Sequence, residues 1–493
     1  MRAAVPIELV PLGVRLEVER GGALAEALAA HGVEFPCGGS ELCGGCRVRV
    51  LEGTLAPCAG DLCVFTDGEI AAGWRLACRA HAEGPLKLEV GQWTAPVLAD
   101  GARLAGSRRQ GAGIAVDLGT TTLAAQLLDL ATGEVLGVRT GLNPQCARGA
   151  DVMSRVSFAL RDDALTRMIR DAVGGMVAEL ASARSDLSEV VIAGNTVMHH
   201  LFCGIDVEPL SHVPFEFRHG GERTFTPREL GWPLPAAARV RFLPCIGGFV
   251  GSDILAGIAA TGIARSTRLA ALIDLGTNGE IVLGNSERIL CASTAAGPAF
   301  EAGTIRMGMR AAAGAVSHVF VRDGRLEAHV IGNAAPRGLC GSGLVDAVAA
   351  GLDTGAILPN GRLANGAREF AVAGSVALAQ SDIRRLQLAK AAIASGLRLL
   401  AARWGANLDD IAVVHLAGAF GNYVRIESAI RVGLLEIPPC RVETAGNTAL
   451  RGAKMMLLSP ELRIEAPIEH IGLASEPGFQ DAFVNAMPFP ALM

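Results

Sequence analysis

The sequence predicts an α/β protein with a small N-terminal domain and a larger second part that is built on a repeated motif. Two observations lead to this prediction. Six of the twelve cysteines fall within the first 80 residues. The tetrapeptide Asp-Leu-Gly-Thr occurs twice, at 117–120 and at 274–277, each time directly after an apolar run. A chain of 493 residues is long enough to form two to four domains with sizeable cores.

Composition excludes several classes of protein. The net charge of −5 and the lack of a basic tail argue against a nucleic-acid partner. No run of about 18 uncharged apolar residues predicts a membrane span. The first residues lack the apolar segment of a secretion signal, so we expect a cytoplasmic protein. In that reducing setting, clustered cysteines indicate metal or redox chemistry instead of disulfides.

The first ninety residues predict a recognisable order of elements. Residues 7–19 read as two short strands about a Pro-Leu-Gly turn, and 21–32 as a short helix that ends at a glycine. A cysteine-rich loop follows, and then strands at 47–53 and 86–90. This order is that of a β-grasp ferredoxin: a strand hairpin, a helix, a metal loop and further strands. We assign such a domain to residues 1–93.

The cysteine loop reads CGGSELCGGC, with its three thiols at Cys37, Cys43 and Cys46. Cys78 supplies a fourth candidate ligand at a distance. Three thiolates on one loop and one distant thiolate suit a 2Fe-2S cluster. The four glycines of the loop allow backbone N–H groups to approach the cluster sulfurs, which tunes its potential.

Two questions about the ligands stay open at this point. A zinc site would pair two short cysteine motifs, Cys43/Cys46 and Cys58/Cys63. That pairing leaves Cys37 unused and the glycine-rich loop unexplained, so the iron–sulfur cluster is favoured. Cys58 competes with Cys78 as the fourth ligand, and Cys78 is preferred because the last ligand of such ferredoxins follows a long excursion of the chain.

The repeated motif divides the rest of the chain. Residues 94–111 lack periodicity and are rich in Gly, Ala and Arg, which predicts a linker. Each copy of the motif contains a buried strand, Asp-Leu-Gly-Thr, a second strand, a short turn and a third strand. We therefore expect a first lobe at 112–270 and a second lobe at 271–493.

The motif's residue types suit a metal ion and phosphate. Asp117 and Asp274 offer hard oxygen ligands for Mg²⁺ at the ends of strands. Gly119 and Gly276 permit a tight turn with close backbone approach. The hydroxyl and amide groups that follow are donors for phosphate oxygens: Thr120, Thr121, Thr122, Thr277, Asn278 and Gly279.

The paired motif resembles the superfamily of acetate and sugar kinases, heat-shock cognates and actin. That resemblance implies two ribonuclease-H-like lobes that clamp ATP between two phosphate loops. The superfamily's glycine-rich adenosine loop has a match in VVHLAGAFGNY, at Gly418 and Gly421. A plain strand–turn–helix corner is the alternative for this segment.

A ferredoxin joined to such an ATPase resembles the reductive activators of corrinoid proteins over nearly all of the chain. Further segments carry the resemblance: 143–156, 193–206, 293–305, 338–346 and 386–396. The short linker departs from the family pattern, because many members carry an additional domain between the ferredoxin and the ATPase.

The resemblance implies a function. One electron would pass through a 2Fe-2S cluster on Cys37, Cys43, Cys46 and Cys78 and reduce inactive Co(II) to Co(I) in a corrinoid methyl-carrier protein. ATP hydrolysis with Mg²⁺ would drive that transfer, and Glu280 could orient the attacking water. An upstream electron donor is required. A homodimer is possible. The apolar stretch 291–346 could be a dimer interface, a docking surface for a partner or simply part of the core.

Three other functions remain as alternatives. The chain could donate electrons to another acceptor, as activators of 2-hydroxyacyl-CoA dehydratases do. It could be a small-molecule kinase with a fused redox domain, or a redox-sensing ATP-binding scaffold without catalytic activity.

Three polar residues between 195 and 200, in the predicted first lobe, need separate interpretation. His199 and His200 are adjacent on a predicted helix, so they diverge by about 100°, and we expect core or interface residues. Asn195 lies at a strand-to-helix corner and is either a helix N-cap or a residue that faces the cleft.

Overall fold

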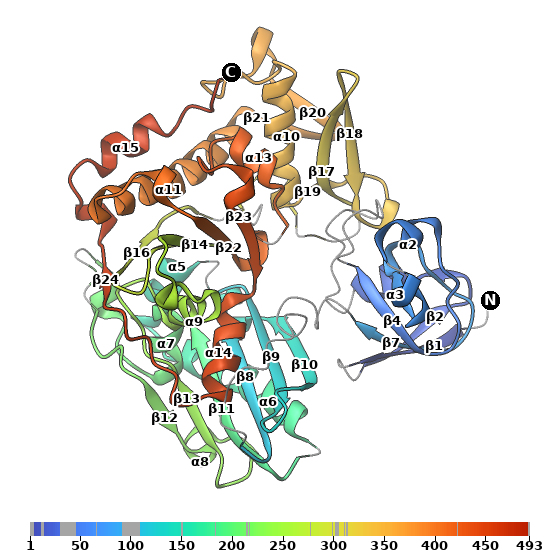
Figure 1. Cartoon of the computed structure of the whole chain (residues 1–493), viewed down its shortest axis with the longest axis vertical. Coiled ribbons are helices and arrows are strands. Elements are labelled where there is room, and N and C mark those ends of the chain that lie inside the picture. The colour runs from blue at the N-terminus through green and yellow to red at the C-terminus, as the bar shows by residue number, and fades with distance from the viewer. Residues whose placement is uncertain are drawn as a thin grey trace.

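Three larger β-sheets organise the protein, shown in Figure 1 as a computed structural model. The structure describes residues 4–10, 14–29, 46–65, 67–90, 109–148, 151–182, 184–212, 215, 217–276, 278–297, 299–300, 305–309, 311, 314–421 and 423–491. None of the helices within these ranges is both long enough and apolar enough to cross a membrane.

The N-terminal domain confirms the predicted order of elements. Its five-stranded sheet runs β2 (Val14–Glu19), β1 (Ala4–Val10), β7 (Leu86–Val90), β4 (Arg47–Glu52) and β5 (Trp74–Leu76). The expected helix is α1 (Leu24–Ala29), preceded by the short strand β3 (Gly22–Ala23), which pairs with β6 (His81–Ala82). Two short helices follow β4, α2 (Ala59–Val64) and α3 (Asp67–Ala71). Leu24 and Leu28 of α1 pack with Ile7 and Leu88 of the sheet in one core.

The first lobe is a six-stranded sheet in the order β10 (Val135–Leu142), β9 (Thr122–Asp129), β8 (Ala112–Leu118), β11 (Leu187–Gly194), β13 (Arg239–Phe242) and β12 (Arg223–Phe225). Its helices are α5 (Val152–Ala159), α6 (Ala164–Ala181), α7 (Thr196–Cys203), α8 (Pro227–Leu230) and α9 (Ser252–Thr261).

The second lobe repeats this plan. Its six-stranded sheet runs β23 (Val442–Gly446), β22 (Val413–Ala417), β14 (Ala270–Leu275), β15 (Gly279–Gly284), β16 (Ile289–Thr294) and β24 (Ile468–His470). In both lobes three antiparallel strands are followed by two that run parallel to the first. The ribonuclease-H-like duplication expected from the paired motif is therefore present.

Smaller elements complete the second lobe. Strands β17 (Ala315–Arg322), β18 (Arg325–Val330) and β19 (Gly338–Leu339) form one small sheet, and β20 (Glu369–Ala373) and β21 (Val376–Ala379) another. The helices are α10 (Gly341–Asp353), α11 (Gln380–Trp404), α12 (Gly418–Gly421), α13 (Ile426–Arg431), α14 (Thr448–Leu458) and α15 (Phe479–Asn485).

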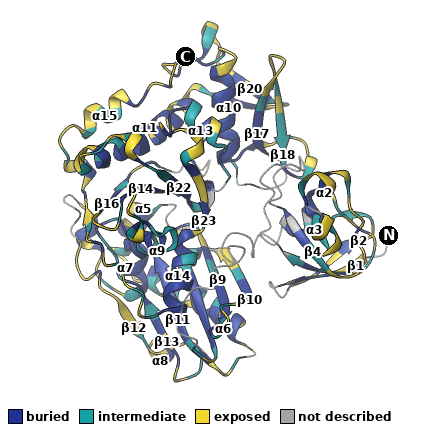
Figure 2. Cartoon of the chain, in the orientation of Figure 1, coloured by how far each residue is buried: buried dark blue, intermediate teal, exposed yellow. Residues whose placement is uncertain are grey.

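The central strands are buried on both faces, as parallel strands between helices must be (Figure 2). On β8, Ile114 and Val116 pack toward α6, whereas Ala115 packs with residues of α14. On β14, Ile273 joins the core with α10 and α11, whereas Leu272 packs against α9. The period-two alternation of a strand thus decides which helix each side chain meets.

Helices α9 and α14 lie against each other with almost no space between them. A Cβ atom on Gly452 would overlap the carbonyl oxygen of Ala256 and lie 2.5 Å from its Cα. Helix α14 comes from the predicted second lobe, yet it packs on β8 and β11 of the first sheet. This pair of helices therefore joins the two lobes.

The apolar stretch 291–346 contributes largely to the core of the second lobe. Ala292, Val316 and Leu344 are all buried in its main hydrophobic cluster. Of the three alternatives raised for this stretch, the structure favours core packing.

Candidate functional site

The turn between β8 and β9 is the first of the predicted phosphate loops, and we call residues 117–122 loop 1. The backbone N–H of Gly119 donates to the carbonyl of Thr122 at 3.0 Å. A Cβ on Gly119 would lie 2.6 Å from that same oxygen, so the tight turn needs glycine. Thr120 is buried, and Thr122 begins β9 with its side chain exposed. The backbone N–H of Asn143 donates to the carbonyl oxygen of Thr121, which ties loop 1 to the residue that follows β10.

The equivalent turn between β14 and β15, residues 274–279, is loop 2. Three residues separate Leu275 from Gly279, one fewer than separate Leu118 from Leu123 in loop 1. The N–H of Gly276 donates to the carbonyl of Asn278 at 3.1 Å. Thr277 lies outside the described residues. Gly279 is buried, and a Cβ there would overlap the side chain of Ile393 on α11, so helix packing requires this glycine.

Four carboxylates gather between the two loops. Asp117 and Asp274 end strands β8 and β14. Glu280 lies directly opposite Asp274 in the β14–β15 pair, so both side chains point to the same face of the sheet. Asp253, in the first turn of α9, completes the group.

Burial and mutual repulsion show that these carboxylates face one another. Burial raises the pKa of Asp117 to about 6, partly offset by a hydrogen bond from Asn447. Burial and then the charge of Asp117 raise the pKa of Asp274 to about 7. The pKa of Asp253 is raised by burial and by Asp274, and the pKa of Glu280 by burial and by Asp253. Concentrated carboxylate oxygens of this kind are the donors that Mg²⁺ prefers.

The third loop is the glycine-rich segment that contains Gly418 and Gly421, and it lies beside Asp274. Strand β22 pairs with β14 so that Ala417 lies beside Asp274. Gly418 follows with a φ of +83°, and a Cβ there would lie 2.6 Å from Oδ1 of Asp274. Gly421 closes the short helix α12 against Leu416. The glycine-rich segment therefore adjoins the carboxylate of loop 2.

Three asparagines hold loop 1, and each of them is also a helix N-cap. Asn143 Nδ2 donates to the carbonyl oxygen of Gly119 at 2.9 Å. Asn195 Nδ2 donates to Thr120 Oγ1 at 2.8 Å. Asn447 Nδ2 donates to Asp117 Oδ2 at 2.7 Å. Each Oδ1 accepts a backbone N–H of the helix that the residue begins. Asn195 is thus a helix N-cap, as one of its two interpretations expected, and it also contacts loop 1; that it faces the cleft stays a prediction.

Sequence reasoning missed two members of this site, Asp253 and Asn447. A signal for Asn447 was present, because Ala-Gly-Asn-Thr occurs at 193–196 and again at 445–448. Asp253 follows Gly251-Ser252 at the start of a helix, a pattern too common to distinguish it.

The two histidines lie in the core, as expected. His199 and His200 are at most 1% exposed, and their ring nitrogens lie near backbone carbonyls. Burial lowers the pKa of His199 to about 4. Neither ring points to the carboxylates, and both stabilise the packing of α7.

The ferredoxin domain brings two of the predicted ligands together. Arg47 pairs with Leu76, so Cys46 and Cys78 lie at the same end of neighbouring strands. The N–H of Ala77 donates to the carbonyl of Cys46 at 3.0 Å, and both thiols are buried. Cys37 and Cys43 lie outside the described residues. Two adjacent buried thiols beside the cysteine loop fit a cluster held by four thiolates.

The zinc alternative receives no support from its described members. Cys46 is 1% exposed, whereas Cys63 lies on the surface of α2. Cys43, which the zinc pairing also requires, lies outside the described residues. At the start of α2 the backbone N–H of Cys58 donates to a carboxylate oxygen of Asp61 at 2.8 Å, and the preference for Cys78 over Cys58 as fourth ligand stays a prediction.

Three family models match successive parts of the chain. Residues 7–83 match the 2Fe-2S iron-sulfur cluster binding domain, and 112–266 match the RACo middle region. Residues 268–493 match the C-terminal domain of RACo, the ASKHA domain. The corrinoid activation enzyme RamQ of Eubacterium limosum is 34% identical over 415 residues, which are 76% of this chain and 69% of RamQ. The chain belongs to the reductive activators of corrinoid proteins.

Two further activators extend the comparison. The Co(II) methylated amine-specific corrinoid protein reductase of Methanosarcina barkeri is 26% identical over 422 residues, 76% of this chain and 77% of the reductase. A solved structure described as a reductive activator for corrinoid,iron-sulfur protein superposes with a TM-score of 0.68 at 26% identity. That superposition covers 99% of this activator and 98% of the solved chain. Membership of this family favours the activator function over the three alternatives.

Proposed function

We propose that this protein is an ATP-dependent reductive activator, which passes one electron through a 2Fe-2S cluster to the cobalt of a corrinoid protein and reduces Co(II) to Co(I). The observation that carries the proposal is the presence in one chain of a ferredoxin domain and of three loops that meet at a group of carboxylates. Relatives named as corrinoid activation enzymes and corrinoid protein reductases support the choice of acceptor.

The cluster ligands in this proposal are Cys37, Cys43, Cys46 and Cys78. A 2Fe-2S cluster, when bound, supplies a one-electron carrier. Cys46 and Cys78 hold their thiols at one end of β4 and β5, buried among apolar side chains. That burial keeps water from the thiolates and lets the chain tune the potential of the group they bind.

The nucleotide site in this proposal lies between loops 1 and 2. Asp117 and Asp274 would hold Mg²⁺ directly or through its waters, with Asp253 nearby, and Mg²⁺ supplies positive charge to the phosphates when bound. Backbone and hydroxyl donors of Thr120, Thr121, Thr122, Thr277 and Asn278 would bind phosphate oxygens, and the Gly418–Gly421 corner the adenosine. Glu280 accepts from Ser293 Oγ at 3.2 Å, which fixes its carboxylate where it could orient an attacking water.

ATP has a thermodynamic role in this scheme. Reduction of Co(II) by a ferredoxin is uphill, and each 59 mV of one-electron mismatch costs about a factor of ten in equilibrium. Nucleotide can supply the missing free energy if it binds two states of the protein with different affinity. A site built from both lobes meets that requirement, because its geometry changes whenever the lobes shift. The scheme also needs an upstream donor that returns an electron after each turnover.

The test is anaerobic. The reduced full-length protein is mixed with a corrinoid protein held as Co(II), and the absorption spectrum is recorded with and without Mg-ATP. We expect Co(I) to appear only with ATP. Co(I) that forms equally without ATP, or that never forms although ATP is hydrolysed, would contradict the proposal.

Two cysteine variants sharpen this test. Cys78→Ser should remove the 2Fe-2S absorption and the corrinoid reduction while it leaves ATP binding intact. Cys58→Ser is the matched control, because Cys58 lies in the same domain and competes for the fourth ligand position. Loss of the cluster in Cys58→Ser with its retention in Cys78→Ser would reverse the ligand assignment. Sedimentation of the same preparations tests the proposed homodimer.

A further inference from the structure

Helix α14 connects the nucleotide site to the start of the first lobe. It runs along β8 in the opposite direction, with Asn447 at its N-terminus beside Asp117. At the other end, Leu457 covers Gly113, where an added Cβ would lie 2.8 Å from Leu457 Cδ1. Eleven residues at 1.5 Å each give α14 a length of about 16 Å.

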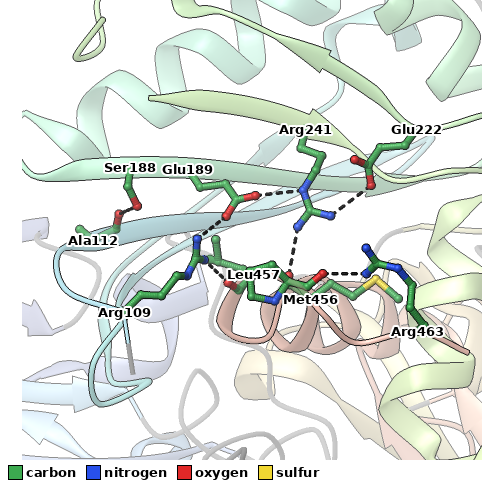
Figure 3. Close-up of polar contacts among 10 residues, drawn as sticks. Arg109, Ala112, Ser188, Glu189, Glu222, Arg241, Met456, Leu457 and Arg463 are labelled. Carbon is green, nitrogen blue, oxygen red and sulfur yellow. Dashed lines mark hydrogen bonds and ion pairs between the residues drawn. The ribbon is translucent and has the colours of Figure 1, made fainter. Parts of the chain in front are cut away.

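The C-terminus of α14 is fixed by a group that we call the arginine clamp: Arg109, Glu189 and Arg241 (Figure 3). Glu189 bridges the two arginines, with distances of 2.9 Å to Arg109 Nη1 and 2.9 Å to Arg241 Nε. Arg241 Nη2 donates to Met456 O at 3.1 Å, and Arg109 Nη2 donates to Leu457 O. Positive charges at the last carbonyls of a helix also complement its dipole.

Arg109 stands just before β8, on the side from which the chain arrives from the ferredoxin domain. The clamp therefore joins three parts of the molecule: the entry into the first lobe, strands β11 and β13, and the last turn of α14. Arg241 and Glu189 are largely buried, with side-chain exposures of 13% and 11%, so solvent screens this network little.

Little in the packing of α14 can absorb a displacement. Helices α14 and α9 touch at Gly452 and Ala256, where there is no room for a methyl group. Most residues of α14 are buried. Close-packed interiors transmit strain, so a shift of the first turn of this helix has to reach its last turn.

We propose that α14 transmits the state of loop 1 to Arg109, and that Asn447 is the positioning residue that makes this link. Asn447 alone among the three asparagines of loop 1 connects that loop to α14; Asn143 and Asn195 connect it to elements of the first lobe. Nucleotide bound at loop 1 thereby fixes the point where the ferredoxin domain is attached. This inference rests on the nucleotide-binding half of the proposed function.

The experiment measures amide hydrogen exchange of the full-length protein with and without Mg²⁺ and a non-hydrolysable ATP analogue. In the unaltered protein we expect slower exchange at loops 1 and 2, and also at 109–113 and 455–463, by about 2- to 10-fold, the range of one ordinary hydrogen bond. Asn447→Ser keeps a good N-cap but removes the amide donor. The affinity of this variant for the analogue should fall, because Asp117 loses its hydrogen-bond donor. At an analogue concentration that saturates loops 1 and 2, the variant should show slower exchange at the loops but not at 109–113 and 455–463.

Asn195→Ser is the matched control, since it removes the same kind of donor from the same loop without touching α14. It should keep the distant effect. Asn447→Asp, which retains the cap oxygen, is the second variant should the serine not fold, and it should also lose the distant effect.

The outcomes separate the inference from the function on which it rests. Absence of any slowing at loops 1 and 2 in the unaltered protein would overturn nucleotide binding itself. Slowing at the loops without a distant effect would overturn only the role of α14. A distant effect that persists in Asn447→Ser, or that Asn195→Ser also abolishes, would overturn the role of Asn447.

Discussion

At the scale of single residues, the two copies of Asp-Leu-Gly-Thr have diverged in their surroundings. Asp117 accepts a hydrogen bond from Asn447, whereas Asp274 faces Glu280 across a strand pair. The position opposite Asp117 is Ala124, which carries no charge. The second copy therefore carries one more carboxyl group, and the proposed water-orienting role of Glu280 belongs to this side of the site.

The pKa values of these carboxyls predict how nucleotide binding depends on pH. Asp117 at about 6 and Asp274 at about 7 must lose their protons before they can bind a dication. Affinity for Mg-ATP should fall at least about 10-fold between pH 7.5 and pH 5.5, because one pKa unit corresponds to a factor of ten. Titration calorimetry at several pH values measures this change, and an affinity independent of pH would contradict it.

The free energy of unfolding of the unliganded protein should change with pH in the direction opposite to the affinity for Mg-ATP. Between about pH 4 and pH 7 the folded state keeps protons on these carboxyls that the unfolded chain has released, so stability falls as pH rises through this window. Asp117→Asn serves as the control, since it should flatten both pH dependences while it weakens Mg-ATP binding throughout.

At the scale of elements, glycines decide how closely the helices and loops can approach. Gly418 brings the third loop against Asp274, and Gly452 brings α14 against α9. The two positions require glycine for different reasons. Gly418 has a positive φ, whereas Gly452 is helical and has no space for a side chain.

Gly452→Ala should therefore destabilise the protein although alanine is the better helix former. Overpacking at such a contact costs about 1–3 kcal/mol, more than the roughly 1 kcal/mol that helix propensity returns. Gly175→Ala on α6 is the matched control, since an added methyl there meets nothing within 4 Å. Denaturant midpoints should fall for Gly452→Ala and rise slightly for Gly175→Ala; equal midpoints would refute the close contact.

At the scale of the whole molecule, the carboxylate group is assembled from both lobes. Loop 1 and Asp253 come from the first lobe, and loop 2 and the Gly418 corner from the second. A ligand bound there holds the lobes together, which makes the stability of the ATPase part depend on nucleotide.

Thermal unfolding tests this dependence. At 100 times its dissociation constant, Mg-ATP analogue should add about 2.7 kcal/mol, and each kcal/mol raises the melting temperature of a lobe of this size by about 2–4 °C. Scanning calorimetry of the full chain measures the shift. Asp274→Asn should reduce it at the same analogue concentration, and an unchanged melting temperature in the unaltered protein would argue against a site shared by the lobes.

The sequence by itself determined the local and repeated features. The cysteine spacing predicted a ferredoxin, and the duplicated Asp-Leu-Gly-Thr predicted two lobes, because both signals lie within a few consecutive residues. Burial of Cys46 and Cys78 at adjacent strand ends agrees with the first prediction. The two six-stranded sheets share the order of five strands, which confirms the second.

Only the tertiary structure decided which distant residues meet. Asn447 contacts Asp117 across 330 positions of the chain, and Leu457 and Arg109 meet across 348. Asp253 joins the carboxylates because α9, which begins at Ser252, packs against both large sheets. Such contacts depend on how helices pack between two sheets, and a periodic pattern in one segment carries no information about the segment it will touch.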